Sequence, residues 1–161
     1  MKKGTLYLLP TPISPDYPQL TLPAGYLEIV NQIHVFITEN IRTTRRFLRS
    51  IGFQKDFDNI PYYLLNKHTL LQELTAFLEP ALHGSDTGLF SEAGMPCIAD
   101  PGAKIVKLAH EKNLNVVPVS GPSSIMLALA ASGFNGQNFV FHGYLPVQST
   151  ERSRSLKRLE S

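Results

Sequence analysis

The segment from Leu89 to Ser124 constrains the fold more than any other part of the chain. It opens on the end of an apolar run, which stops at the small and turn-forming residues SEAGMP. Asp100 can then cap a helix that begins at Pro101, because a proline at the first helical position loses no hydrogen bond. A short buried strand at residues 116–119 follows, and the pair Gly121-Pro122 opens another helix. Both loops therefore follow the carboxyl end of a strand, the edge at which parallel sheets bind ligands.

Short apolar runs alternate with helix-like segments along the rest of the chain. Asn40 is expected to cap a helix, Gly52 to end the same helix, and Pro80 to limit a later one. The expected strands are residues 4–9, 34–38, 61–65, 87–90, 116–119 and 138–142, and the expected helices are residues 25–32, 41–51, 69–78, 101–113 and 123–132. This alternation predicts an α/β fold, a three-layer domain in which helices cover both faces of a parallel sheet.

Length and composition narrow the class of protein. A chain of 161 residues with 43% hydrophobic residues can bury the core of one domain. The net charge of +2 is too small to indicate nucleic-acid binding by itself. The single cysteine, Cys97, excludes an internal disulfide and fits a reducing cytoplasm. The apolar residues 6–9 are too few for a signal peptide and are followed by Pro10 and Pro12, and no run reaches membrane-spanning length.

Familiar catalytic and nucleotide-binding motifs are absent. The sequence has no G-x-G-x-x-G, no Walker A loop, no H-E-x-x-H, no cysteine pair for zinc and no G-x-S-x-G, so no metal site is expected. Four loops of small residues remain at the predicted edge: residues 10–13, 91–96, 120–124 and 143–146. Glycine lets a backbone approach a ligand closely, and free N–H groups suit polar or anionic groups. Any one of these loops could equally be an ordinary turn.

The helix over residues 41–51 has an unusual charge distribution. Arg42, Arg45, Arg46 and Arg49 follow i, i+3, i+4, i+7 spacing and so share one face. Four like charges on one face repel one another, so helix stability alone does not favour them. The face could bind the phosphates of RNA, or it could be a solvated surface without a partner.

Several segments together resemble one family. GTLYLLPTPI, ITENIRTTRRFL, SEAGMPCIADPGAKIV, NVVPVSGPSS and FHGYLP occur in the order and spacing of the tetrapyrrole methylase superfamily. Among its branches, the chain is most similar to the small-subunit ribosomal RNA (cytidine-2′-O)-methyltransferase I group, which methylates a ribose 2′-hydroxyl. The resemblance extends over nearly the whole chain.

The resemblance implies a fold, a cofactor and an assembly. Members are two-domain α/β proteins, usually homodimers, that hold S-adenosylmethionine in a cleft between the domains. Residues 1–146 would be the N-terminal α/β domain, and residues 147–161, which are basic and poor in apolar side chains, would be a linker into a second domain absent from this chain. The cofactor would contact the first three loops through Pro10, Ser91, Glu92, Ala93, Gly94, Ser120, Gly121 and Pro122.

Two carboxylates near strand ends are candidates for a general base in methyl transfer. Glu39 follows the strand at 34–38, and Glu92 lies in the loop after residue 90. Glu39 could instead pair with Arg42, and Glu92 could instead accept hydrogen bonds from neighbouring N–H groups. Asp100 is expected to be a helix cap.

These observations favour an S-adenosylmethionine-dependent methyltransferase that 2′-O-methylates a ribosomal RNA nucleotide, with ribosomal RNA or the small ribosomal subunit as partner. One alternative is a C-methyltransferase of a tetrapyrrole in cobalamin or siroheme synthesis. An alternative of another class is a non-catalytic nucleotide- or RNA-binding module. The sequence leaves the methyl acceptor, the general base and the oligomeric state open.

Overall fold

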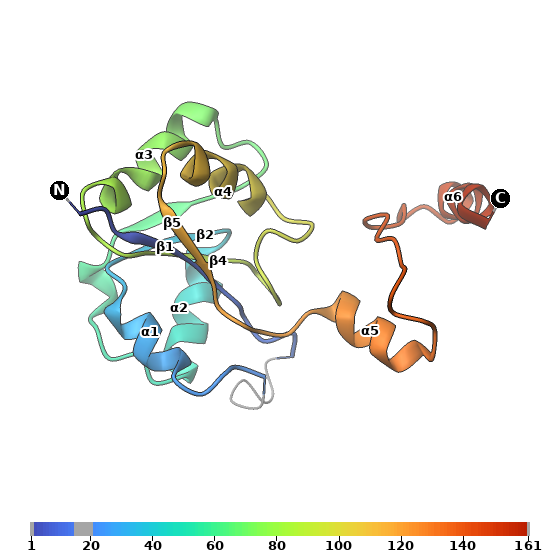
Figure 1. The fold of residues 1–161 in the computed structure, drawn as a ribbon, viewed down its shortest axis with the longest axis horizontal. Coiled ribbons are helices and arrows are strands. Elements are labelled where there is room, and N and C mark those ends of the chain that lie inside the picture. Colours follow the sequence, from blue (N-terminus) through green and yellow to red (C-terminus); the bar gives the residue numbers. More distant parts are fainter. Residues whose placement is uncertain (1, 15–20, 161) are drawn as a thin grey trace.

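A parallel β-sheet lies between two layers of helices in the computed structural model, which describes residues 2–14 and 21–160 (Figure 1). Within these residues the sheet has five strands in the order β3-β2-β4-β1-β5, and every pairing is parallel. The strands are β1 Thr5–Leu9, β2 Val35–Thr38, β3 Tyr62–Leu64, β4 Thr87–Phe90 and β5 Asn115–Pro118.

Helices cover both faces of this sheet, as the alternating pattern predicts. One layer contains α1 (Tyr26–Gln32) and α2 (Ile41–Ser50), and the other contains α3 (Leu71–Leu82) and α4 (Gly102–Glu111) (Figure 1). A single turn of 3₁₀ helix, Phe57–Asn59, precedes β3. The predicted α/β, three-layer fold is confirmed. No helix in the described part of the chain is long and apolar enough to cross a membrane.

Successive residues of the central strands contribute to two separate cores. Leu89 and Ile37 pack under α3 and α4, whereas their neighbours Phe90 and Phe36 pack under α1 and α2. Burial of each such side chain contributes about 1.5–3 kcal/mol. Gly88 opposes Phe36 in the sheet, and a Cβ at Gly88 would lie 3.0 Å from the Phe36 ring. The glycine therefore leaves room for an aromatic ring on the central strands.

The start of α2 is fixed by Asn40, as predicted. The Asn40 side-chain oxygen accepts hydrogen bonds from the backbone N–H groups of Arg42 (3.0 Å) and Thr43 (3.3 Å). At the other end Gly52 has a φ of +81°, a left-handed conformation that glycine adopts without strain. Both ends of α2 are therefore specified locally, which orients the helix that borders the candidate site.

Two sequence predictions about element boundaries and burial are wrong. Pro80 does not limit α3 but lies inside it. The helix ends two residues after this proline, and the Pro80 carbonyl accepts from the N–H groups of His83 (3.2 Å) and Ser85 (2.9 Å) at that end. The strand predicted as buried, β5, is instead half-exposed, because it forms a sheet edge and pairs with β1 alone.

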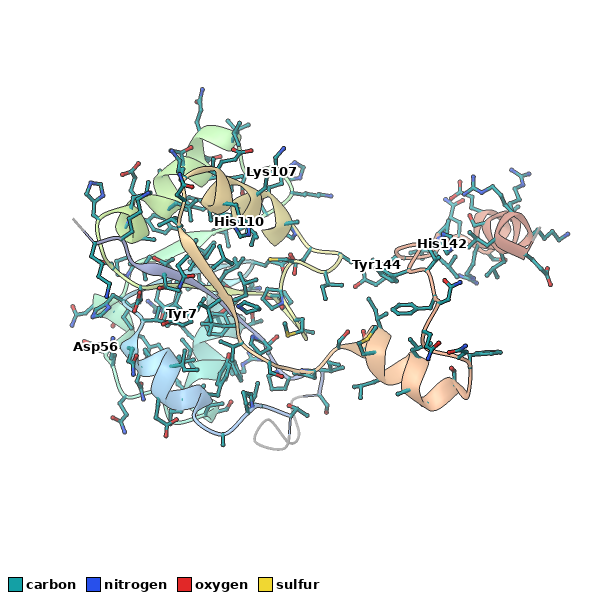
Figure 2. The ribbon with its side chains drawn as sticks, viewed as in Figure 1. Tyr7, Asp56, Lys107, His110, His142 and Tyr144 are labelled. Carbon is teal, nitrogen blue, oxygen red and sulfur yellow. The ribbon has the colours of Figure 1, made fainter. Side chains whose placement is uncertain are left out.

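The strand predicted at residues 138–142 does not form. This segment follows α5 (Ser124–Ser132) and leads to α6 (Ser149–Glu160), and all three lie away from the sheet (Figure 1). A strand needs a neighbour for its N–H and C=O groups, and the segment lies beyond reach of either edge strand. Figure 2 shows His142 and Tyr144 on this extended stretch, and the Tyr144 side chain is exposed.

Replacement of the α2 cap gives a test of this local specification. Asn40→Ala should lower the free energy of unfolding by about 1 kcal/mol, because two N–H groups of the first turn lose their acceptor. Chemical denaturation measures the change, with Gln32→Ala on the exposed end of α1 as the control. An unchanged denaturation midpoint for Asn40→Ala would show that α2 is held by packing alone.

Candidate functional site

Two of the predicted loops are joined by their backbones at the carboxyl edge of the sheet. The Thr11 N–H donates to the Gly94 carbonyl (3.0 Å), and the Gly94 N–H donates to the Thr11 carbonyl (2.9 Å). The loops meet because β1 and β4, which they follow, are neighbours in the sheet. Gly94 has a φ of +70°, and a Cβ there would lie 3.1 Å from the carbonyl oxygen of Pro122.

The third loop packs directly on the first. A Cβ at Gly121 would lie 2.2 Å from the Pro10 Cβ, so only glycine permits this approach. The hydroxyl of Tyr26, on α1, donates a hydrogen bond to the Pro10 carbonyl (2.6 Å), and this bond attaches the first loop to the helix. The structure therefore brings Pro10, Gly94 and Gly121 to one edge of the sheet, as the sequence predicts. Their contact with a cofactor stays a prediction.

The remaining predicted cofactor residues differ in burial. Ser91 is buried, and its hydroxyl donates to the carbonyl groups of Gly94 (3.2 Å) and Ala93 (3.4 Å), so it shapes the loop from inside. Glu92, Ala93 and Ser120 are exposed. The loop after β4 thus presents Glu92 and Ala93 outward on a scaffold held by Ser91.

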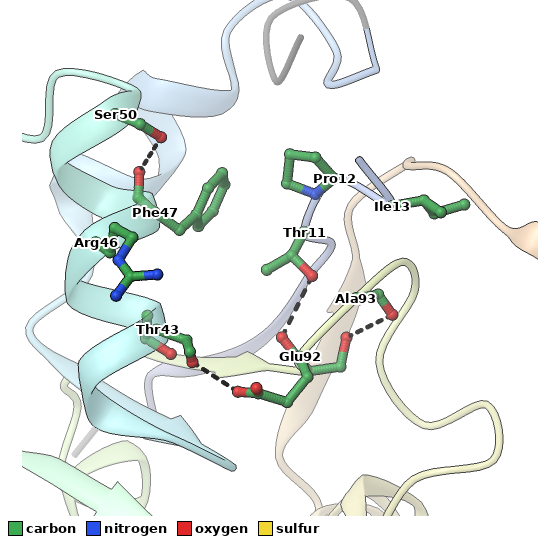
Figure 3. A pocket seen from close by; sticks show the side chains of 11 residues that line it. Thr11, Pro12, Ile13, Thr43, Arg46, Phe47, Ser50, Glu92 and Ala93 are labelled. Carbon is green, nitrogen blue, oxygen red and sulfur yellow. Dashed lines mark hydrogen bonds between the residues drawn. The ribbon is translucent and has the colours of Figure 1, made fainter. Parts of the chain in front are cut away.

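A pocket of about 340 Å³ lies between α2 and the first two loops (Figure 3). Arg46, Phe47 and Thr43 face Thr11 and Glu92 across it. The full lining, named here the α2 pocket, is Thr11, Pro12, Ile13, Thr43, Thr44, Arg46, Phe47, Ser50, Ser91, Glu92 and Ala93. Charged, hydroxyl and aromatic groups therefore share one small cavity.

A second pocket of about 450 Å³ adjoins the first and shares Ile13 and Ala93 with it. Its lining is composed largely of small and apolar residues. These residues, named here the loop pocket, are Ile13, Ala93, Gly94, Met95, Ile98, Ala99, Ser123, Ser124, Ile125, Ala128, Phe141 and Tyr144. The same sheet edge thus presents two neighbouring cavities of different chemical character.

The two candidate carboxylates lie in different positions. The Glu92 carboxylate lines the α2 pocket and accepts a hydrogen bond from the Thr43 hydroxyl (2.7 Å). The Glu39 carboxylate accepts instead from the Glu92 N–H (3.3 Å) and lines neither pocket. Burial raises the pKa of Glu39; the Glu92 N–H opposes this shift, and the charges of Asp100 and Glu92 reinforce it. No ion pair joins Glu39 to Arg42 in the part of the chain that is described.

The four arginines of α2 are divided by their contacts. Arg45 donates to the carboxylate of Asp58 (3.2 Å) and to the Phe57 carbonyl (2.9 Å). Arg49 stacks on the Phe57 ring, with 4.9 Å between guanidinium carbon and ring centroid. Arg46 lines the α2 pocket, and Arg42 is exposed in the first turn. Although the four arginines are regularly spaced in the sequence, two of them, Arg45 and Arg49, bind the neighbouring 3₁₀ turn.

Asp100 and Cys97 have structural surroundings. The Asp100 carboxylate accepts from the N–H groups of Gly102 and Cys97, both at 2.7 Å, so it binds the first N–H of α4 as a capping group does, although α4 begins at Gly102, one residue later than predicted. Burial, and secondarily the charge of Asp100, raises the pKa of Cys97 to about 12. Its thiol is therefore not a nucleophile at neutral pH. Among the described residues, no three His, Cys, Asp or Glu side chains form a metal-binding group.

Sequence analysis missed three residues that shape the site: Thr43, Phe47 and Tyr26. Thr43 and Phe47 lie one turn apart on α2, on the side that borders the pocket. Their i, i+4 spacing places them on one side of the helix, but nothing in the local sequence indicates that this side borders a cavity. No local pattern indicates that the Tyr26 hydroxyl reaches a carbonyl 16 residues earlier.

Comparison with known proteins defines the class. A family model described as Tetrapyrrole (Corrin/Porphyrin) Methylases matches residues 15–160. The chain belongs to this family, which confirms the resemblance found in its motifs.

Individual relatives share a narrower name. The chain is 32% identical to Ribosomal RNA small subunit methyltransferase I of Escherichia coli O157:H7, over 99% of this chain and 53% of that protein. Proteins of the same name from Haemophilus influenzae (32% identical, 97% of this chain and 52% of the relative) and Synechocystis sp. (34%, 97% and 53%) are also similar. The chain spans about half the length of the curated relatives it matches.

The raised pKa of Glu39 predicts a pH-dependent effect on stability. Glu39→Gln should raise the free energy of unfolding at about pH 7, because folding no longer desolvates a charge and the amide oxygen can still accept from Glu92. At about pH 3, more than one unit below the ordinary glutamate pKa, the carboxyl is protonated in both states and the difference should disappear. Chemical denaturation at the two pH values measures it. A lower stability of the variant at neutral pH would mean that the charged hydrogen bond outweighs desolvation.

Proposed function

We propose that this protein is an S-adenosylmethionine-dependent methyltransferase that acts on ribosomal RNA, most specifically on a ribose 2′-hydroxyl. The observation that carries the proposal is the pair of adjoining pockets at the joined loops. Methyl transfer requires a donor and an acceptor held next to each other in a fixed orientation. The α2 pocket and the loop pocket share Ile13 and Ala93, so two ligands could meet there. Membership of a methylase family and the names of the relatives support the same reaction.

The loop pocket suits the cofactor. Its walls combine apolar side chains with Ser123, Ser124 and the loop residues Ala93 and Gly94. These groups fit an adenosine and a thioether chain better than a metal or a multiply charged ligand. The loops themselves would be held at a fixed distance from one another by the close contacts of Pro10, Gly121 and Pro122. When bound, S-adenosylmethionine supplies a sulfonium methyl group, and a neutral thioether is the leaving group.

Glu92 is the group best placed to act on the acceptor. Its carboxylate lies in the α2 pocket, beside the residues that both pockets share, and can accept the proton of an acceptor hydroxyl. Thr43 orients this carboxylate through the 2.7 Å hydrogen bond. Glu39 would act indirectly, by its hydrogen bond to the Glu92 N–H. A ribosomal substrate also implies the cytoplasm, and the family resemblance implies a homodimer.

Calorimetric titration with S-adenosylhomocysteine tests the cofactor site. Wild-type protein should bind it, and Gly121→Ala should weaken binding by about tenfold or more, because overpacking against Pro10 costs about 1–3 kcal/mol and separates the loops. Gly136→Ala is the matched control, since its Cβ would meet only Leu129 at an ordinary 3.7 Å. Circular dichroism checks that both variants fold. Absence of binding to the wild-type chain at millimolar ligand would contradict the proposal.

Transfer of labelled methyl groups then identifies the acceptor. Label should enter the ribosomal RNA of purified small subunits and resist alkaline cleavage at the modified nucleotide, because the 2′-oxygen is blocked. Label in a tetrapyrrole precursor instead would support the alternative within the same family. Cofactor binding without transfer to either acceptor would support a non-catalytic binding module.

A further inference from the structure

We propose that the α2 pocket binds the acceptor nucleotide of a single-stranded RNA segment, and that Arg46 binds a phosphate of that nucleotide. The inference deepens the proposed function and rests on it for the nature of the acceptor. It also assigns different roles to arginines that look equivalent in the sequence.

The contacts of α2 single out Arg46. Arg45 is held by Asp58 and by the Phe57 carbonyl, and its guanidinium lies 4.9 Å above the Tyr62 ring. Arg49 lies on the Phe57 ring. Arg46 alone of the four lines the α2 pocket, and it has no ion-pair partner among residues 2–14 and 21–160. A guanidinium at the rim of a cavity, with no acidic partner in the described part of the chain, suits a phosphate.

The pocket carries opposite charges on opposite walls. Arg46 lies on α2, and Glu92 lies on the loop after β4 (Figure 3). Within the described chain these two side chains do not form an ion pair. The arrangement fits a ligand with an anion at one end and a hydrogen-bond donor at the other, which describes a nucleotide with its phosphate and ribose hydroxyl. A tetrapyrrole with ionised carboxylates around its rim would be repelled by Glu92.

Size and wall chemistry agree with one nucleotide. The volume of about 340 Å³ lies near the lower end of the range of about 300–1,000 Å³ for small-ligand sites. Phe47 and Pro12 provide apolar walls against which a base or ribose can pack. Only an unstacked nucleotide can enter such a cavity, and a single-stranded segment supplies one without the cost of flipping a base out of a duplex. The shared residues Ile13 and Ala93 would place it beside the cofactor.

Fluorescence anisotropy with a labelled single-stranded oligocytidylate, in the absence of cofactor, tests the inference. Arg46→Ala should weaken binding by about tenfold or more and reduce the salt dependence by about one phosphate contact. Arg49→Ala removes the same charge from the same helix but from outside the pocket, and should weaken binding by less than about threefold. Arg46→Lys, which keeps the charge, should recover part of the loss. The 2′-deoxy oligomer should bind more weakly, because it offers Glu92 no hydroxyl.

Several results would overturn the inference. Equal losses of RNA affinity for Arg46→Ala and Arg49→Ala would indicate a diffuse basic surface. Unchanged RNA affinity in both variants would exclude the pocket as the binding site, and so would a wild-type chain that binds no RNA. Equal affinity for the 2′-deoxy oligomer would remove the part assigned to Glu92. Titration of the Arg46→Ala protein with S-adenosylhomocysteine separates the two proposals. Unchanged cofactor binding with weakened RNA binding supports both, whereas absent cofactor binding in wild type contradicts only the proposed function.

Discussion

The reciprocal hydrogen bonds between Thr11 and Gly94 are the interaction on which the candidate site depends. They join the loop after β1 to the loop after β4, and both pockets include residues of these two loops. Because these hydrogen bonds link backbone groups, the contact between the two loops depends on strand order and loop conformation more than on side-chain identity. The third loop is held differently: Gly121 packs directly against Pro10, which is possible because glycine has no Cβ. The edge is therefore built from close backbone approach, which small residues alone allow.

Against this rigid edge, α2 contributes the side chains that give the site its chemistry. Its position is set by the Asn40 cap, by Leu48 in the core and by a buried hydrogen bond between the Thr38 and Thr44 hydroxyls. Thr38 ends β2, so the hydroxyl pair ties the first turn of the helix to the sheet. Thr43 is carried into contact with Glu92 by the same turn. The orientation of the candidate base is thus coupled to the packing of the helix.

Local rules in the sequence predict most of the elements and the edge at which the loops meet. The Asn40 cap, the role of Asp100 and the convergence of Pro10, Gly94 and Gly121 all follow from turn chemistry and from parallel α/β topology. Strand order does not follow, because nothing local places β5 at an edge. Residues 138–142 show the opposite failure, since strand-like composition forms no strand without a neighbouring edge. The division of the chain at residue 147 and the cofactor contacts stay predictions.

The arginines of α2 show why helical periodicity alone does not identify a binding face. The i, i+3, i+4, i+7 spacing places four guanidinium groups on one side of α2. This side is wide enough for its two borders to contact different parts of the protein. One edge meets the turn at Phe57–Asn59 and binds it through Arg45 and Arg49, while the other edge borders the α2 pocket at Arg46. In the proposed assignment the cofactor site relies on backbone and the acceptor site on side chains, so substitutions on α2 would alter acceptor binding without disturbing cofactor binding.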